Sequence, residues 1–165
     1  MVESRIFDVP LGKGRIGICQ MPGRGDRVAD LQTIKNWGAN LVLTMTTLAE
    51  LDRVGMGDIE QRLTELEISW RHLPIEDFGA PNSSTGKSCI QAAAHAHKIL
   101  QNGGSVLAHC WGGCGRSGMA LLRLMVEAGE PVDAALARLR KVRPCAVETP
   151  QQKKWAASGT KTGNR

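Results

Sequence analysis

Long apolar runs are absent from this chain of 165 residues, which argues against a membrane-spanning helix. The segment Met1–Pro10 contains three charged residues and lacks the apolar stretch of a secretory signal, so we expect a cytoplasmic protein with no membrane partner. Although the net charge is +5, no stripe of lysine and arginine with interleaved aromatic residues is present. A nucleic-acid partner is therefore not expected.

Regular cysteine spacing is also absent. The five cysteines are odd in number and irregularly placed, at Cys19, Cys89, Cys110, Cys114 and Cys145. We expect reduced thiols rather than a disulfide framework. Three residues separate Cys110 from Cys114, which is neither a C-x-x-C nor a zinc-finger spacing, and no second Cys/His pair completes a four-ligand site. A structural zinc site is therefore not expected, and the chemistry that Cys110 and Arg116 suggest below requires no metal or other cofactor.

The residues that are present, 42% hydrophobic and 22% charged, are typical of a globular protein with a hydrophobic core. No internal repeat or linker is visible in the sequence. We expect one folded domain over residues 1–157, followed by a disordered tail over residues 158–165.

Apolar runs alternate with helical patterns along the chain. Strands are expected at Arg15–Cys19, Asn40–Met45, Ser69–Ile75 and Ser105–His109. Helices are expected at Arg27–Trp37, Thr47–Val54, Ile59–Glu67, Thr85–Asn102, Ser117–Ala128 and Val132–Val142, with a short helix after Pro150. Asp26 and Gly38 are the expected ends of the first helix, and Ser83, Ser84 or Thr85 is the expected N-cap of the long one. This alternation predicts an α/β fold, a single domain with a central, mostly parallel sheet of four or five strands flanked by helices.

The segment His109–Gly118, with the sequence HCWGGCGRSG, links an expected strand to an expected helix. Its three loop glycines allow the backbone to curl so that successive N–H groups point inward. The following helix adds its free N–H groups and the positive end of its dipole. Such a cradle suits a tetrahedral dianion. The expected anion-binding residues are those of the loop and its arginine: Trp111, Gly112, Gly113, Cys114, Gly115 and Arg116.

Cys110 lies at the mouth of this cradle, where the N–H groups and Arg116 favour its thiolate, the nucleophilic form of cysteine. Arg116 follows six residues later, and its planar guanidinium can bind two phosphate oxygens at once. Ser117 can donate a hydrogen bond to the sulfur and so help it leave in a second step. The alternative is that Cys110 is a buried cysteine at a strand end and that the glycines form an ordinary turn. The preceding histidine, the three glycines and the following Ser-Gly pair together favour the functional reading.

The loop resembles the signature H-C-x5-R-[ST] of the protein tyrosine phosphatase superfamily, and its dual-specificity branch in particular. More narrowly, it is similar to the kinase-associated phosphatase (cyclin-dependent kinase inhibitor 3) family, whose loop reads H-C-x-G-G-x-G-R-S. The similarity extends to Ile16–Cys19 with Met21–Gly23 and to Leu73–Pro81, and covers roughly Gly12–Gln152. It implies the cysteine-dependent phosphatase fold and hydrolysis through a phosphocysteine. A kinase partner does not follow, because surface recognition is separable from the loop.

Cleavage of a phosphate ester needs an acid for the leaving oxygen and later a base for water. Asp77 lies 33 residues before Cys110, on a loop after an expected strand, and matches the resembled family's general acid. The adjacent Glu76 is the alternative acid. Phe78, the next residue, is an expected substrate contact.

For three further residues the sequence suggests a role without defining it fully. Gln152 falls where the resembled family often has a glutamine that positions water. Glu148 stands where that family's other glutamine would be, which leaves its role open. Cys114 either forms a reversible disulfide with Cys110 or only packs. In the second case the redox partner of Cys110 would be Cys89, or Cys110 would have none.

The sequence contains no tyrosine and is short, which implies that the aromatic recognition loop of tyrosine-specific relatives is missing. A shallow pocket would admit phosphoserine and phosphothreonine as well as phosphotyrosine, with Phe78 and Trp111 as an apolar rim. No lysine lies between Cys110 and Arg116, whereas lipid phosphatases of the superfamily typically have lysines there. We therefore expect phosphorylated proteins or peptides as substrates. The oligomeric state is left open.

Two rival functions are weighed against this one. A rhodanese-type sulfurtransferase also uses a cysteine in a strand–loop–helix cradle, but Arg116 followed by Ser117 and a separate acid loop favour the phosphatase. A catalytically weak phosphoprotein-binding module is the rival from another class. The presence of Cys110, Arg116 and Asp77 together argues against it.

Overall fold

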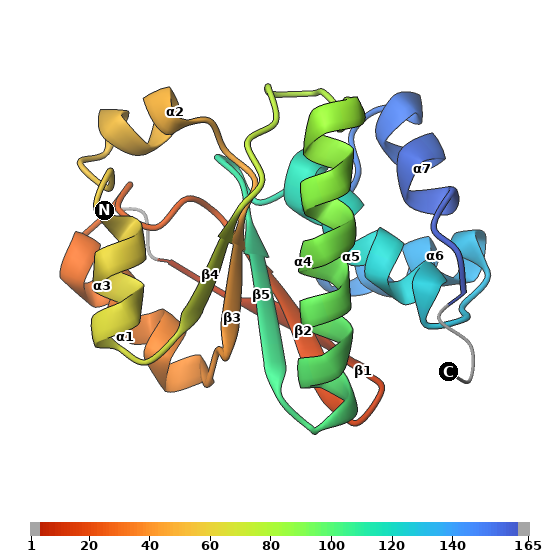
Figure 1. The fold of residues 1–165 in the computed structure, drawn as a ribbon, viewed down its shortest axis with the longest axis horizontal. Helices are drawn as coiled ribbons and strands as arrows, with labels where there is room; N and C mark the ends of the chain where they lie inside the picture. Colours follow the sequence, from red (N-terminus) through yellow and green to blue (C-terminus); the bar gives the residue numbers. More distant parts are fainter. Residues whose placement is uncertain (1–3, 162–165) are drawn as a thin grey trace.

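A five-stranded sheet forms the centre of the computed structural model, which describes residues 4–161 (Figure 1). The strand order is β1-β2-β5-β3-β4, in which β1 is antiparallel to β2 and all other neighbours are parallel. The strands are β1 (Phe7–Leu11), β2 (Gly14–Cys19), β3 (Leu41–Thr44), β4 (Ser69–His72) and β5 (Ser105–His109). The expected α/β class and mostly parallel sheet are confirmed.

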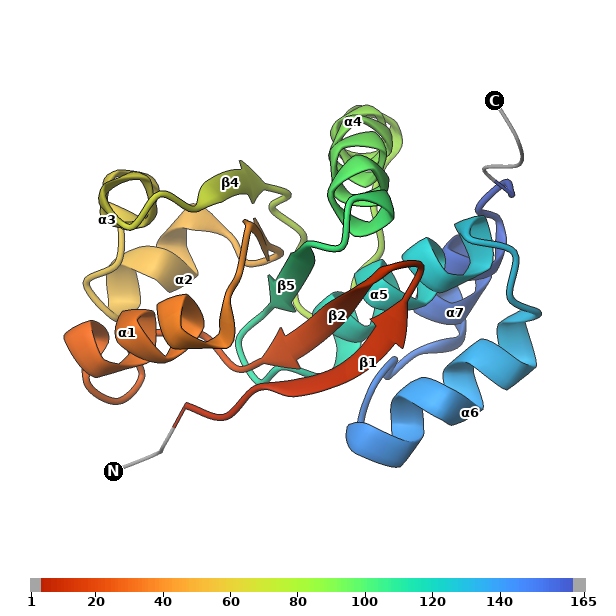
Figure 2. The ribbon, with the colours of Figure 1, turned by 90° about the horizontal axis from the view of Figure 1, so that it is seen from below.

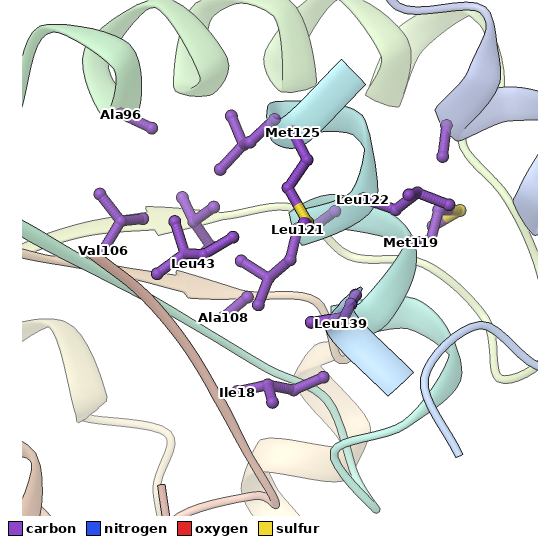
Figure 3. Packing of buried hydrophobic residues seen from close by; sticks show 14 of the residues in the cluster. Ile18, Leu43, Ala96, Val106, Ala108, Met119, Leu121, Leu122, Met125 and Leu139 are labelled. Carbon is purple, nitrogen blue, oxygen red and sulfur yellow. The ribbon is translucent and has the colours of Figure 1, made fainter. Parts of the chain in front are cut away.

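Helices cover both faces of this sheet (Figure 2). They are α1 (Arg27–Trp37), α2 (Leu48–Arg53), α3 (Ile59–Glu65), α4 (Ser83–Gln101), α5 (Gly115–Glu127), α6 (Val132–Val142) and α7 (Pro150–Ala157). Residues of α1, α2 and α3 pack with Val42 and Leu107 on one face. On the other face, α4, α5 and α6 pack against the opposite side chains of the same strands, and Figure 3 shows Leu121 of α5 beside Leu43 and Ala108. Such burial of both faces explains why the central strands have consecutive apolar residues, Leu41–Leu43 and Val106–Ala108, instead of an alternating pattern.

Local capping sets several helix ends as expected, and one differently. The Asp26 carboxylate accepts a hydrogen bond from the Ala29 N–H at 2.9 Å, and Gly38 ends α1 with a φ of +92°. The expected N-cap of α4 among Ser83, Ser84 and Thr85 is wrong. Asn82 is the cap, and its side-chain oxygen accepts the Thr85 N–H at 2.9 Å.

The edge strand β1 was not expected from the sequence. Its register pairs Pro10 with Arg15 and Asp8 with Gly17, in a tight hairpin with β2. Proline and a charged residue are poor signals for a strand, but both are tolerated at a sheet edge, where one row of backbone groups needs no partner. At the other edge β4 ends at His72, three residues before the expected end at Ile75, because the chain turns there into an extended loop.

The parallel strands bring three chain segments together at one edge of the sheet. His109, the last residue of β5, pairs with both Cys19 of β2 and Thr44 of β3. The carboxyl ends of parallel strands are the usual position of a binding crevice in an open α/β sheet. Helix α2 and the connection from β4 to α4 lie at this edge too (Figure 1).

The C-terminal part of the chain packs on α5. Helix α7 ends at Ala157, and the Ser158 hydroxyl accepts a hydrogen bond from Arg123 at 3.2 Å. Of the expected tail, residues 162–165 lie outside the described residues. Between residues 4 and 161 no helix combines the length and the apolarity needed to cross a membrane.

Candidate active site

The glycine-rich loop connects β5 to α5 and is held from its outer side. The Trp111 carbonyl accepts the Met21 N–H at 3.0 Å, and the carbonyls of Gly112 and Gly113 accept the guanidinium of Arg143 at 2.8 and 2.9 Å. Three successive carbonyls that bond outward leave the loop N–H groups for the inner side, as an anion cradle requires. Gly113 is needed here because its φ is +73° and a Cβ would collide with the backbone of Cys19.

Cys110 and Ser117 meet at the base of this loop. Their Sγ and Oγ atoms are 3.1 Å apart, and both side chains are buried. Helix α5 begins at Gly115, two residues earlier than expected, and this places Ser117 in its first turn. The serine hydroxyl is therefore in position to donate a hydrogen bond to a Cys110 thiolate, as the sequence predicts.

His109, directly before the glycine-rich loop, links the start of the loop to β3. Its Nε2 lies 2.7 Å from the Thr44 hydroxyl, and its Nδ1 lies 3.3 Å from the Cys110 carbonyl. Burial lowers the pKa of His109 to about 4, so the ring is neutral near pH 7. The carbonyl can only accept, so Nδ1 carries the proton and Nε2 accepts from Thr44.

Arg116 is almost entirely buried, with 1% of its surface exposed. Its two terminal nitrogens each donate to one carboxylate oxygen of Glu50 at 2.8 Å, and one of them also donates to the Ile75 carbonyl at 2.9 Å. Its Nε is buried and has no hydrogen-bond partner among the described residues. A buried donor without a partner is costly, and a phosphate oxygen in the cradle would supply that partner.

Glu50 was not predicted from the sequence as a site residue. Burial alone would raise the pKa of its carboxyl, but hydrogen bonds from Arg116 and from the Thr47 N–H outweigh burial and lower that pKa to about 2. Glu50 is therefore ionised at any working pH and fixes the plane of the guanidinium. The only sequence signal for it is the T-x-x-E capping box that starts α2 at Thr47.

The candidate acid lies on the loop after β4. A carboxylate oxygen of Asp77 is 3.4 Å from the Arg116 guanidinium, and 55% of the side chain is exposed. The next residue, Phe78, has a φ of +62° and its ring is exposed, so the turn at this point is strained for a side chain of that size. Among the described ion pairs of Arg116, Asp77 appears and Glu76 does not. The geometry therefore favours Asp77 over Glu76.

Gln152 lies beside the glycine-rich loop, where a side chain on Gly115 would collide with its amide. It is fully buried, and its side-chain oxygen accepts the backbone N–H groups of Glu148 and Thr149 at 2.9 and 3.2 Å. Its amide nitrogen donates to the Gly79 carbonyl at 3.1 Å. Gln152 thus ties the acid loop to the start of α7. The Glu148 carboxylate lies against Gly115, where a side chain on the glycine would collide with it.

Trp111 was expected to form part of an apolar rim of the pocket, but arginine side chains contact its ring. The guanidinium carbons of Arg24 and Arg53 lie 5.0 and 4.7 Å from the centre of its ring, and Arg24 also donates to the Trp111 carbonyl at 3.3 Å. The ring packs against the core on the α1 side of the sheet. Two exposed positive charges therefore flank the loop beside Cys110.

The expectation of reduced thiols is wrong for two cysteines. Cys114 forms a disulfide with Cys145, which follows α6, and their Cα atoms are 5.1 Å apart. Cys110 is a free thiol, as are Cys19 and Cys89. Both alternatives for Cys114, a disulfide with Cys110 and packing alone, are therefore contradicted. No pattern in the sequence predicts this pair, because 30 residues separate the two cysteines and only the return of the chain after α6 brings them together.

The buried, neutral His109 makes the fold sensitive to acid. In the unfolded chain the imidazole takes up a proton below its usual pKa of 6.5, whereas in the fold it does so only below about 4. Its contribution to stability is complete above pH 6.5 and is lost as the pH falls to about 4, by about 3 kcal/mol in all. We expect the unfolding free energy, measured by urea titration, to fall over this range, and His109→Asn to flatten the slope. An identical slope in the variant would contradict this assignment.

A family model described as "Tc-R-P: Polymorphic toxin system, DSP-PTPase phosphatase" matches residues 18–130. The chain belongs to this DSP-PTPase family. The matched residues run from β2 through α5 and include the loop, Glu50 and Asp77. The resemblance drawn from the sequence is thereby confirmed.

Individual relatives of this DSP-PTPase chain agree with the family model. Cyclin-dependent kinase inhibitor 3 of Sus scrofa is 29% identical over 136 residues, which are 78% of this chain and 63% of that protein. The Mus musculus protein of the same name is 30% identical over the same shares. The chain thus matches less than two thirds of the length of these relatives.

Solved structures share the fold. Kinase associated phosphatase with its catalytic site cysteine replaced by serine superposes with a TM-score of 0.82 at 22% identity, over 94% of this chain and 93% of that one. Tk-PTP in the active form has a TM-score of 0.67 at 27% identity, over 86% and 88% of the two chains. The five-stranded sheet and its helices are therefore those of cysteine-dependent phosphatases.

Proposed function

We propose that this chain hydrolyses phosphomonoesters on proteins in two steps, through a phosphocysteine at Cys110. The observation that supports this most is the convergence of three groups on one glycine-rich loop. They are the Cys110 sulfur, the Ser117 hydroxyl 3.1 Å from it, and the buried Nε of Arg116, which has no hydrogen-bond partner within residues 4–161.

In the first step the Cys110 thiolate attacks phosphorus and the bond from phosphorus to the ester oxygen breaks. Asp77 gives its proton to the leaving oxygen. The loop N–H groups and Arg116 hold the equatorial oxygens, and their fixed positive ends stabilise the charge of the transition state. Glu50 keeps the guanidinium in place through its two 2.8 Å hydrogen bonds.

In the second step water attacks the phosphocysteine. Asp77, now ionised, takes a proton from that water, and the sulfur leaves as a thiolate. The Ser117 hydroxyl donates to the departing sulfur and stabilises its charge. Inorganic phosphate is the product, and the protein returns to its starting state without a metal or other cofactor.

We infer a protein substrate with dual specificity. The loop residues between Cys110 and Arg116 include no lysine, so the loop has no side-chain cation for further phosphates of an inositol ring. Phe78, 57% exposed beside Asp77, is placed to contact an aryl group without closing the pocket to shorter side chains. The exposed guanidiniums of Arg24 and Arg53 suit acidic residues next to the phosphorylated one.

A comparison of kcat/KM on three substrate types tests this specificity. Phosphotyrosyl peptides and phosphothreonyl peptides should both be turned over, and soluble inositol phosphates should be poorer substrates than either. Preference for inositol phosphates would refute the protein substrate, and activity confined to phosphotyrosine would refute dual specificity. Acidic flanking residues in the peptide should raise kcat/KM, and this gain should fall as salt screens the arginines.

A chromogenic aryl phosphate separates this function from its rivals. A phosphatase releases the aryl alcohol with kinetics that depend on Cys110, whereas a phosphoprotein-binding module binds the phosphate without turnover. A sulfurtransferase would instead transfer sulfur from thiosulfate to cyanide. The Asp77 carboxylate facing Arg116 favours the phosphatase, because sulfur transfer has no need of an acid for an ester oxygen.

A further inference from the structure

The Cys114–Cys145 disulfide joins the glycine-rich loop between β5 and α5, which we call the phosphate loop, to the segment that precedes α7. Cys114 is the N-cap residue of α5, directly before Gly115 and Arg116. Cys145 lies in the α6–α7 connection and is exposed, whereas Cys114 is half-buried. The bond is thus accessible from solvent on the Cys145 side, and the loop that it restrains is itself only half-buried at Trp111, Gly112 and Cys114.

Other contacts between the same two segments surround this bond. We call residues 143–147 the clasp segment. Its first residue, Arg143, binds the carbonyls of Gly112 and Gly113, and the N–H of its last residue, Val147, donates to the Cys114 carbonyl at 3.2 Å. The clasp segment therefore holds three successive residues of the phosphate loop.

The clasp segment is itself strained. Val147 has a φ of +67°, a conformation that a β-branched residue rarely adopts. Such a conformation persists only where the surroundings determine it strongly. Arg140 contributes by donating to the Ala146 and Val147 carbonyls at 2.9 and 2.8 Å, and the disulfide contributes a covalent restraint. Loss of that restraint would let the strained backbone relax away from the loop.

We propose that Cys114 and Cys145 form a reversible thiol–disulfide exchange site, whose oxidised state holds the phosphate loop in its catalytic geometry. The proposal rests on the proposed phosphatase function for its effect on turnover, but not for the exchange chemistry. The co-reactant is a dithiol reductant. Cys110 takes no part, so reduction lowers activity by loosening the loop and leaves the nucleophile free.

The exchange proceeds in two displacements. One thiolate of the dithiol attacks the exposed Cys145 sulfur, the bond between Cys145 and Cys114 breaks, and Cys114 leaves as a thiolate that takes up a proton from solvent. The second thiolate of the reductant then attacks the reductant's first sulfur, which is bonded to Cys145 in the mixed disulfide. The bond to Cys145 breaks, and Cys145 is released as a thiolate. Two electrons pass to the cysteine pair, and the reductant becomes a disulfide.

The surroundings of Cys114 favour it as the leaving thiolate. It caps the N-terminus of the 13-residue helix α5, and a terminal nitrogen of Arg143 lies 3.9 Å from its sulfur. A helix N-terminus and a neighbouring guanidinium both stabilise a thiolate. The free thiols outside this loop are less suited to exchange. Burial raises the pKa of Cys89 to about 11 and raises that of Cys19 further.

The test equilibrates the full chain, without oxygen, in buffers with different ratios of reduced to oxidised dithiothreitol. Alkylation and peptide mass spectrometry measure the redox state of each cysteine, hydrogen exchange measures the protection of residues 111–117, and an aryl phosphate gives kcat/KM. We expect reduction of the pair to raise exchange in the loop and to lower kcat/KM by about tenfold or more, since small displacements of catalytic groups are costly. Cys110 should remain a free thiol in both states.

Two alanine variants serve as a matched pair. Cys145→Ala should behave like the reduced wild type and ignore the dithiothreitol ratio, whereas Cys89→Ala, which removes a free thiol in α4, should respond as the wild type does. The proposal is overturned if the pair stays reduced in fully oxidised dithiothreitol. Equal loop exchange and equal kcat/KM in the two redox states would overturn it too. If the protein has no phosphatase activity at all, disulfide mapping and hydrogen exchange in the loop still test the redox exchange of Cys114 and Cys145. The two proposals can therefore fail separately.

Discussion

Serine in place of Cys110 is expected to reduce turnover of every phosphomonoester by roughly 10⁵-fold or more. A serine hydroxyl stays protonated where a thiol ionises, so the first displacement loses its nucleophile. The change removes little volume from a side chain that is only 3% exposed, and the fold should be kept. We expect an unchanged melting temperature, activity below detection in a chromogenic assay, and retained phosphopeptide binding by calorimetry, because Arg116 and the loop remain.

Cys89→Ala is the control for this substitution. It alters a buried free thiol of α4 that takes no part in the loop, so its kcat should match that of the wild type. Measurable turnover by a correctly folded Cys110→Ser protein would refute a cysteine nucleophile.

Asparagine in place of Asp77 is expected to slow hydrolysis of alkyl phosphates by roughly 10²–10⁴-fold. Such esters leave as strongly basic alkoxides and need the proton that Asp77 supplies. A nitrophenyl phosphate has a good leaving group, so its rate should fall much less. The fall in rate on the alkaline side of the wild-type pH–rate profile, which loss of the general acid's proton causes, should disappear in the variant.

Glu76→Gln is the matched control, since it removes the adjacent carboxylate and leaves Asp77 in place. The wild-type pH profile and leaving-group dependence should persist in this variant. If Glu76→Gln abolishes the alkaline decline and Asp77→Asn does not, the general acid is Glu76 and the 3.4 Å contact of Asp77 with Arg116 has another role.

The parts that the sequence predicted are those fixed by short stretches of chain. The loop from His109 to Gly118 combines glycines, a nucleophile and an arginine within ten residues, so strand, loop and helix could be inferred together. The central strands β3 and β5 were equally clear, because both of their faces are buried and each has three consecutive apolar residues, Leu41–Leu43 and Val106–Ala108.

The missed parts depend on contacts between distant segments. Glu50 reaches Arg116 across 66 positions of sequence, and in the sequence it reads only as part of a helix cap. Cys145 meets Cys114 only because α6 returns the chain to the loop. The hydrogen bond from the Gln152 amide to the Gly79 carbonyl was not foreseen either, because 73 positions of sequence separate the two residues. A pattern along the chain identifies the residue types of a site, whereas its supporting contacts come from tertiary structure.

A phosphocysteine at Cys110 should be observable in a single-turnover experiment with Ser117→Ala. Without the hydroxyl 3.1 Å from Sγ, the sulfur should leave more slowly in the second step, while the first step stays fast. Rapid mixing with nitrophenyl phosphate should then give a burst of about one nitrophenolate per protein, and quenched samples should carry a phosphoryl group on the peptide that contains Cys110. A linear time course without a burst, together with no phosphoryl group on Cys110, would contradict the mechanism.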